Sequence, residues 1–276
     1  MHPDLGLTGL QGGLFLEITV LGCWAPYPRA GGACSGYLLR GGGRNILLEA
    51  GNGSLSKLMA FLDFRRLDAV IISHLHPDHF LDLFPLRHAI EGARREGSRT
   101  EPLDLFLPAR PDQIFQVLAG YKKAFNPVPI EEIPLEENLP GIPVRRLDLG
   151  GLSIRFVPSR HSLPGYIISF TGAGKLVFSG DTGPCDAFWQ AVNDIDNLRH
   201  LIIECAFPDR EEALAIASRH LCPRQLALEL RKLERPCDIH ITHLKPGQME
   251  LTMAEIERSL GEFRPQLLRH KQVFEF

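Results

Sequence analysis

The chain has 276 residues, of which 44% are hydrophobic and 23% are charged, and its formal net charge at pH 7 is −3. This composition is typical of a globular protein with a sizeable core, and it excludes collagen-like repeats and intrinsic disorder. The sequence has no run of about 20 apolar residues that could span a membrane, and its 30 basic against 33 acidic side chains disfavour a protein that binds mainly nucleic-acid phosphates.

Short apolar runs closed by glycine, proline or polar clusters begin after residues 1–13, which we expect to form a flexible N-terminal extension. These first residues lack the basic region of a signal peptide, and Glu17 interrupts the apolar run that starts at Leu14. The elements predicted up to residue 125 are strands at 14–21, 37–39, 45–49, 69–72 and 103–107, and helices at 54–64 and 113–125.

The second half continues the alternation of strands and helices. Strands are predicted at 152–157, 166–170, 175–178, 201–203 and 238–241, and helices at 186–192, 224–233 and 254–263. Two irregular segments, 92–102 and the proline-rich 126–143, are interpreted as surface loops. Strands interspersed with helices indicate an α/β (α+β) fold, and we expect residues 14–276 to form one layered domain.

Six cysteines are scattered along the chain without a Cys-x-x-Cys pair. They are Cys23, Cys34, Cys185, Cys205, Cys222 and Cys237. This spacing fits neither a small disulfide framework nor a cysteine-based zinc ribbon. We therefore expect reduced thiols and a cytoplasmic protein.

Three histidines and one aspartate are concentrated in six positions directly after the apolar run 69–72. They are His74, His76, Asp78 and His79. Side chains alternate along an extended segment, so His74 and His76 can point the same way and share one ion. The other two lie in the following turn and can face a second ion. Such a dense polar cluster would be costly to bury without a metal, so the motif predicts a metal site.

Further ligands are needed to complete two coordination shells, and three candidates follow other predicted strands. His161, Asp181 and His243 each come after an apolar run and are followed by glycine or proline. Asp181 could instead cap a helix, because aspartate is favoured at helix starts.

The motif His-x-His-x-Asp-His at 74–79, followed by these isolated residues, resembles the signature of the metallo-β-lactamase superfamily of binuclear hydrolases. The resemblance covers nearly the whole chain and implies a four-layer αββα sandwich. It implies that His74, His76 and His161 hold a first ion, that Asp78, His79 and His243 hold a second, and that Asp181 bridges the two. A shell of histidine and aspartate ligands with a bridging carboxylate suits zinc, with manganese or iron as alternatives.

Within the superfamily, true β-lactamases usually have cysteine at the place of Asp181, which argues against that activity. The segments 204–207, 218–223 and 241–246 are similar to the class II cyclic-nucleotide phosphodiesterases. The related tRNA 3′-processing endonucleases share the Glu-x-x-Phe element that begins at Glu204.

The resemblance implies that a hydroxide held between two ions attacks phosphorus while the ions neutralise the developing charge. His220 is the candidate donor of a proton to the leaving group, with Glu204 fixing its tautomer, although His220 could also be a capping or loop histidine. We assign catalytic roles to Asp78, His220 and Glu204. Lys245 could contact a substrate phosphate or be a solvated lysine.

The leading functional hypothesis is a phosphodiesterase acting on a cyclic nucleotide or a similar small phosphodiester. An RNA-processing nuclease, a hydrolase of carboxylic, sulfuric or thioesters, and a non-catalytic metal-binding sensor are the alternatives. We expect a small-molecule partner and no membrane partner, disfavour nucleic acid, and leave a homodimer open. Arg94, Arg95 and Arg99 could contact nucleic acid, but a solvated loop is favoured.

Overall fold

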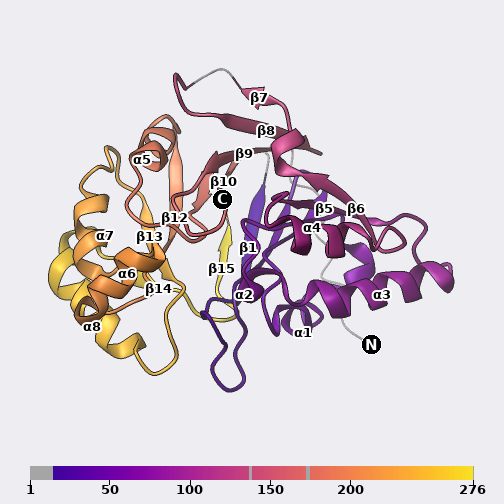
Figure 1. Ribbon diagram of the computed structural model, residues 1–276, viewed down its shortest axis with the longest axis horizontal. Helices are drawn as coiled ribbons and strands as arrows, with labels where there is room; N and C mark the ends of the chain where they lie inside the picture. The colour runs from indigo at the N-terminus through magenta and orange to yellow at the C-terminus, as the bar shows by residue number, and fades with distance from the viewer. Residues whose placement is uncertain (1–14, 137–138, 172–174, 276) are drawn as a thin grey trace.

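The computed structural model describes residues 15–136, 139–171 and 175–275, so the expected extension at 1–13 lies outside the described residues. Two β-sheets face each other across the middle of the molecule, and helices cover the outer face of each sheet (Figure 1). The successive layers are helices, sheet, sheet and helices. The expected four-layer αββα architecture is confirmed.

The first sheet has seven strands in the order β15-β1-β2-β3-β4-β5-β6. They are β1 (Leu16–Gly22), β2 (Gly36–Gly41), β3 (Arg44–Leu48), β4 (Ala69–Ile71), β5 (Leu103–Leu107), β6 (Phe125–Pro129) and β15 (Val273–Glu275). Strands β3 to β6 run parallel to one another. Side chains alternate along β3, so Ile46 and Leu48 pack between the sheets while Leu47 packs under the helices.

Helices from the first half of the chain cover the outer face of the first sheet (Figure 1). The elements are α1 (Ser54–Leu58), η1 (Phe64–Arg66), α2 (Pro77–Phe80), α3 (Leu83–Arg95) and α4 (Asp112–Ala119). The short η2 (Ile130–Glu132) instead contributes Ile130 to the core between the sheets. In α3, Leu83, Leu86 and Ile90 are buried at spacings of three and four residues. This spacing places them on one stripe of the helix, which packs on the sheet.

The second sheet has eight strands in the order β14-β13-β12-β11-β10-β9-β8-β7. They are β7 (Leu135–Glu136), β8 (Val144–Leu149), β9 (Leu152–Pro158), β10 (Tyr166–Thr171), β11 (Lys175–Phe178), β12 (Leu198–Glu204), β13 (Asp238–Thr242) and β14 (Gln266–Leu267). Strands β11 to β14 run parallel, and β7 to β11 pair antiparallel.

The remaining helices belong to this second half. They are α5 (Asp186–Asn193), η3 (Asp209–Glu211), α6 (Glu212–Ser218), α7 (Pro223–Leu230), α8 (Met249–Leu260) and η4 (Gly261–Phe263). Apolar side chains of α5, α7 and α8 pack on the outer face of the sheet. Among the described residues, no helix combines the length and the apolar character that crossing a bilayer requires.

The expectation of surface loops at 92–102 and 126–143 is wrong in part, because both segments contribute to regular elements. Residues 92–95 belong to α3, and 125–129 form β6. Pro127 and Pro129 lie in β6, which is the last strand of its sheet. A terminal strand has one edge without a hydrogen-bonded neighbour, so the missing N–H of proline is tolerated there.

Candidate metal centre

Loops from both sheets meet at one edge of the sandwich. His74 follows β4 of the first sheet, whereas His161, Asp181 and His243 follow β9, β11 and β13 of the second. Loops that follow the carboxyl ends of parallel strands are a common place for ligand sites. An isolated β-bridge between His74 and Gly165 joins the two sheets beside this edge.

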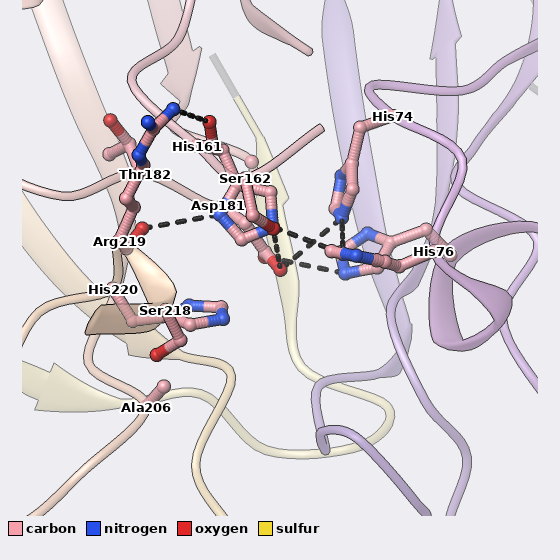
Figure 2. Close-up of polar contacts among 12 residues, drawn as sticks. His74, His76, His161, Ser162, Asp181, Thr182, Ala206, Ser218, Arg219 and His220 are labelled. Carbon is pink, nitrogen blue, oxygen red and sulfur yellow. Dashed lines mark hydrogen bonds and ion pairs between the residues drawn. The ribbon is translucent and has the colours of Figure 1, made fainter. Parts of the chain in front are cut away.

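Asp181 lies at the middle of the cluster. Its Oδ2 atom lies 3.3 Å from His74 Nε2 and 3.8 Å from His161 Nε2. His76 Nδ1 lies 3.0 Å from both of these Nε2 atoms. Figure 2 shows the four side chains converging on a common space from different parts of the chain.

The other carboxylate oxygen of Asp181 faces a second group of donors. Asp181 Oδ1 lies 2.9 Å from His243 Nε2 and 3.3 Å from His79 Nε2. Asp78 Oδ2 lies 3.5 Å from His243 Nε2 and 3.6 Å from His79 Nε2. One carboxylate therefore stands between two donor groups, an arrangement suited to two neighbouring cations.

The donors fit divalent metal ions in both chemistry and spacing. Within each group, the candidate ligand atoms lie within 4.8 Å of one another. Asp181 Oδ1 is buried and has no hydrogen-bond partner among the described residues. Buried polar atoms left without partners are costly, and a cation would satisfy them. The structure thus brings together all seven residues that the sequence proposed as ligands, and they could bind divalent metals.

Burial keeps most of the cluster's imidazoles neutral. It lowers the pKa of His74, His76, His161 and His243. For His76, the pKa falls to about 4. Burial alone would raise the pKa of Asp181, but the surrounding imidazoles hold it well below its ordinary value. Neutral imidazoles and an ionised carboxylate are the forms that bind a cation.

Glu49 supports the second donor group through His79, and it was not among the residues predicted from the sequence. Glu49 Oε2 accepts a hydrogen bond from His79 Nδ1 at 2.6 Å, and Oε1 accepts one from the Ser73 N–H at 2.6 Å. The side chains of Glu49 and His79 are fully buried. A carboxylate on one ring nitrogen fixes the tautomer and directs the other nitrogen toward a metal. The signal in the sequence is an acidic residue that directly ends the apolar run at 46–48 and is followed by Ala50 and Gly51.

His220 is held beside both donor groups by Glu204. His220 Nδ1 donates to Glu204 Oε1 at 2.8 Å, and the fully buried Glu204 carboxylate also accepts from three backbone N–H groups. The His220 ring centre lies 4.8 Å from that of His161 and 5.2 Å from that of His243. Burial opposes the charged imidazole, but the Glu204 carboxylate outweighs burial and raises the pKa of His220 to about 9. The structure therefore places His220 next to the cluster, with a carboxylate partner that favours its protonated form.

Lys245 follows His243 closely, but its ammonium group has other partners. Lys245 Nζ lies 3.2 Å from the centre of the Phe207 ring and 3.9 Å from Glu211 Oε2. Burial lowers the pKa of Lys245. Its role as a substrate contact stays a prediction.

Two of the three arginines in segment 92–102 donate hydrogen bonds to the local backbone. Arg99 donates to the carbonyl groups of Arg65 and Leu67, and Arg94 donates to the carbonyl group of Lys123. These contacts occupy the two side chains with the protein's own backbone. Arg95 is exposed and the other two arginines are half-buried, so the solvated loop stays the favoured prediction.

Comparison with known proteins agrees with this architecture. A family model described as "Beta-lactamase superfamily domain" matches residues 44–260. The probable metallo-hydrolase YhfI of Bacillus subtilis is 30% identical over 193 residues, which are 70% of this chain and 73% of YhfI. Ribonuclease Z of Mycobacterium tuberculosis is 30% identical over 197 residues, which are 68% of this chain and 70% of the nuclease.

Solved structures share the fold over almost the whole chain. The crystal structure of B. subtilis YhfI has a TM-score of 0.79 at 24% identity and covers 95% of this chain and 100% of YhfI. A diphosphatase from the PhnP family has a TM-score of 0.70 at 17% identity and covers 95% of this chain and 98% of the diphosphatase.

Proposed function

The chain belongs to the β-lactamase superfamily of metal-dependent hydrolases, and on that premise we propose that it is a binuclear phosphodiesterase acting on a cyclic nucleotide or a similar small phosphodiester. The observation that carries the proposal is the position of Asp181, whose two oxygens face two separate groups of donors. A double cationic centre suits a phosphodiester, because negative charge develops on several oxygens during attack at phosphorus.

We assign the residues to two ions as follows. His74, His76 and His161 would hold the first, Asp78, His79 and His243 would hold the second, and Asp181 would serve both. Imidazole and carboxylate donors suit zinc, which we propose as the metal, with manganese and iron as alternatives. When bound, such a pair of ions lowers the pKa of a water molecule toward neutrality and neutralises charge on the phosphate oxygens.

The protein's own groups supply the proton transfers. Because His220 Nδ1 donates to Glu204, His220 Nε2 is the nitrogen that remains to give a proton to the leaving alkoxide. Glu204 is a positioning residue, fixed by backbone N–H groups on both of its oxygens. The Asp78 carboxylate faces the second donor group and is proposed to accept a proton from the attacking water.

A small substrate is favoured by the way the middle of the chain folds. Within segment 92–143, α4 packs on the first sheet, β6 is part of it, η2 contributes Ile130 to the core between the sheets, and β7 pairs with β8 at the edge of the second sheet (Figure 1). Most of the described part of this segment therefore belongs to the fold, which leaves little of it for the long arm that we would expect of a tRNA-processing nuclease. The similarity to ribonuclease Z favours RNA processing as the second candidate function.

A substrate panel tests the proposal. Protein loaded with zinc should hydrolyse bis-p-nitrophenyl phosphate and cyclic AMP, and elemental analysis should find close to two ions per chain. Asp181→Ala should abolish turnover and loosen the bound metal. Cleavage of a tRNA precursor or of a thioester, without cleavage of cyclic AMP, would assign the site to another substrate class. A fully active protein without metal would overturn the proposal.

We also propose a cytoplasmic location. All six cysteines are free, and each is buried or half-buried. Free thiols persist in reducing compartments, which supports this location.

A further inference from the structure

A hollow of about 510 Å³ lies next to the metal centre, on the other side of His161. The walls come from four parts of the second half: the loop after β9, the turn before α5, the residue that ends α6, and the turn after α7. The lining residues that carry charge are Arg160, Asp186, Arg219 and Lys232. The chemistry of the hollow therefore depends on how these charges are balanced.

Lys232 and Asp186 largely neutralise each other. Lys232 Nζ lies 2.6 Å from Asp186 Oδ1 and 2.6 Å from Glu229 Oε1. The Lys232 ammonium, and to a smaller extent Arg160, lower the pKa of Asp186, so this carboxylate stays ionised. Asp186 is the one acidic side chain in the lining, and it is already paired.

Neither arginine forms an ion pair with a carboxylate among the described residues. Both are exposed, and each makes one hydrogen bond to a backbone carbonyl among the described residues: Arg160 to Pro184 O at 3.2 Å and Arg219 to His161 O at 2.8 Å. A guanidinium carries five N–H donors in a planar fork, so most of the donors on each arginine are free to bind an anion. The hollow thus has an excess of positive charge in a chain whose net charge is −3.

The hollow is coupled directly to the metal centre through His161. Figure 2 shows Arg219 contacting the backbone of His161, while the ring of His161 points toward His76 and Asp181. The Arg219 carbonyl also accepts a hydrogen bond from His161 Nδ1 at 3.2 Å. Only His161 would therefore separate an anionic group beside Arg219 from a phosphodiester bound at the donor cluster.

We infer that this hollow binds a second phosphate group of the substrate, so that the substrate is a phosphodiester carrying an additional phosphate on the same molecule. The inference rests on the proposed function. Arginine forks match phosphate oxygens in bidentate geometry, which is why unbalanced arginines near a catalytic centre suit this group. The second phosphate does not react: water adds to the phosphorus of the diester, one P–O ester bond breaks, and the additional phosphate leaves the reaction intact.

Arg160 offers the cleaner test, because Arg219 also positions His161. We would compare thymidine 5′-(4-nitrophenyl phosphate) with its 3′-phosphorylated form, which differs only by the second phosphate. The wild-type protein should prefer the 3′-phosphorylated substrate in kcat/KM. Arg160→Gln should reduce that preference by about tenfold or more, as expected for the loss of a charge-assisted hydrogen bond. Arg258→Gln removes the same charge from the exposed face of α8 and should leave the preference unchanged.

Failure of this inference can be distinguished from failure of the proposed function. If the wild type hydrolyses both substrates without preference, or Arg160→Gln leaves the preference unchanged, the subsite is overturned while the phosphodiesterase stands. If the metal-loaded protein hydrolyses neither substrate, the proposed function fails. In that case, calorimetry with thymidine 3′,5′-bisphosphate decides about the hollow: weaker binding by Arg160→Gln supports it, and equal binding refutes it.

Discussion

At the scale of single residues, His220 can either carry a proton or bind a metal ion. Its Nδ1 is taken by Glu204, but one of its nitrogens also lies within 4.8 Å of ligand atoms of Asp181 and His243. The two roles differ in whether metal binding depends on the His220 side chain. A general acid can be removed without loss of metal, whereas a ligand cannot.

We expect His220→Ala to keep two ions per chain and to slow the hydrolysis of cyclic AMP by at least about 100-fold. Hydrolysis of bis-p-nitrophenyl phosphate should fall much less, because nitrophenolate leaves without a proton. Elemental analysis and steady-state kinetics on both substrates check this. His88→Ala, at an exposed histidine of α3, is the control. Equal losses on both substrates would refute the acid role, and loss of one ion would make His220 a ligand.

Glu49 shows how a residue outside the ligand set can determine metal binding. Its two oxygens accept from His79 Nδ1 and from the Ser73 N–H, one residue before His74. Glu49 adopts a positive φ of 61°, a conformation that is uncommon for residues other than glycine. The carboxylate thus stabilises both donor groups at once from a constrained backbone position.

Glu49→Gln should weaken metal binding by about 10- to 100-fold, because an amide has only one oxygen with which to accept both hydrogen bonds. Metal content after dialysis against a competing chelator measures the effect. Glu250→Gln, an exposed residue at the start of α8, should retain metal like the wild type. Unchanged metal affinity in Glu49→Gln would show that His79 is oriented by other contacts.

At the scale of secondary-structure elements, the last strand joins the two sheets. Phe274 of β15 packs against His200 of β12 and His240 of β13, with ring centres 5.1 Å and 4.4 Å apart. His240 is buried, and its Nε2 lies 3.0 Å from His200 Nδ1. Burial, and to a smaller extent the adjoining His200, lower the pKa of His240 to about 4, although Asp238 opposes the shift.

This burial makes stability depend on pH. In the unfolded chain, His240 takes up a proton near pH 6.5, but in the folded chain it stays neutral down to about pH 4. The His240 contribution is therefore complete above pH 6.5 and is lost as the pH falls from 6.5 to 4, by an amount on the order of 3 kcal/mol. His240→Leu should reduce the loss of unfolding free energy over this range, as measured by urea denaturation. His88→Ala should lose as much stability as the wild type. Identical pH profiles for His240→Leu and the wild type would contradict the prediction.

At the scale of the whole molecule, the candidate metal centre connects the two halves. The segment after β4 of the first sheet supplies His74, His76, Asp78 and His79. Loops that follow strands of the second sheet supply the other three donors. Ions bound between the halves stabilise the folded state by mass action, because the unfolded chain does not bring the donors together.

Removing the metal should therefore lower the melting temperature by about 10 °C for a chain of this size, if the ion is present at about a thousand times its Kd. Differential scanning calorimetry with and without a chelator measures the difference. In Asp181→Ala, the difference between loaded and chelated protein should shrink. Equal melting temperatures for loaded and metal-free wild type would contradict a centre that joins the halves.

Several elements were accessible from the sequence and others were not. The predicted strand at 69–72 and the predicted helix at 186–192 correspond closely to β4 and α5, because their apolar patterns are continuous and their ends carry clear turn residues. The helix α3 has an amphipathic pattern that the prediction missed. The strand β6 contains two prolines and could not be recognised locally, since only its place at the edge of the sheet makes them acceptable.

The sequence by itself determined which donors are present, because motif spacing and strand-end positions are local properties of the chain. The seven expected donors are indeed brought together. Only the tertiary structure decided that His79 meets His243, 164 positions away, that Glu49 supports His79, and that Arg219 lies against His161. Such contacts depend on how two sheets pack face to face, and side-chain periodicity within one segment carries no information about the register between the two halves.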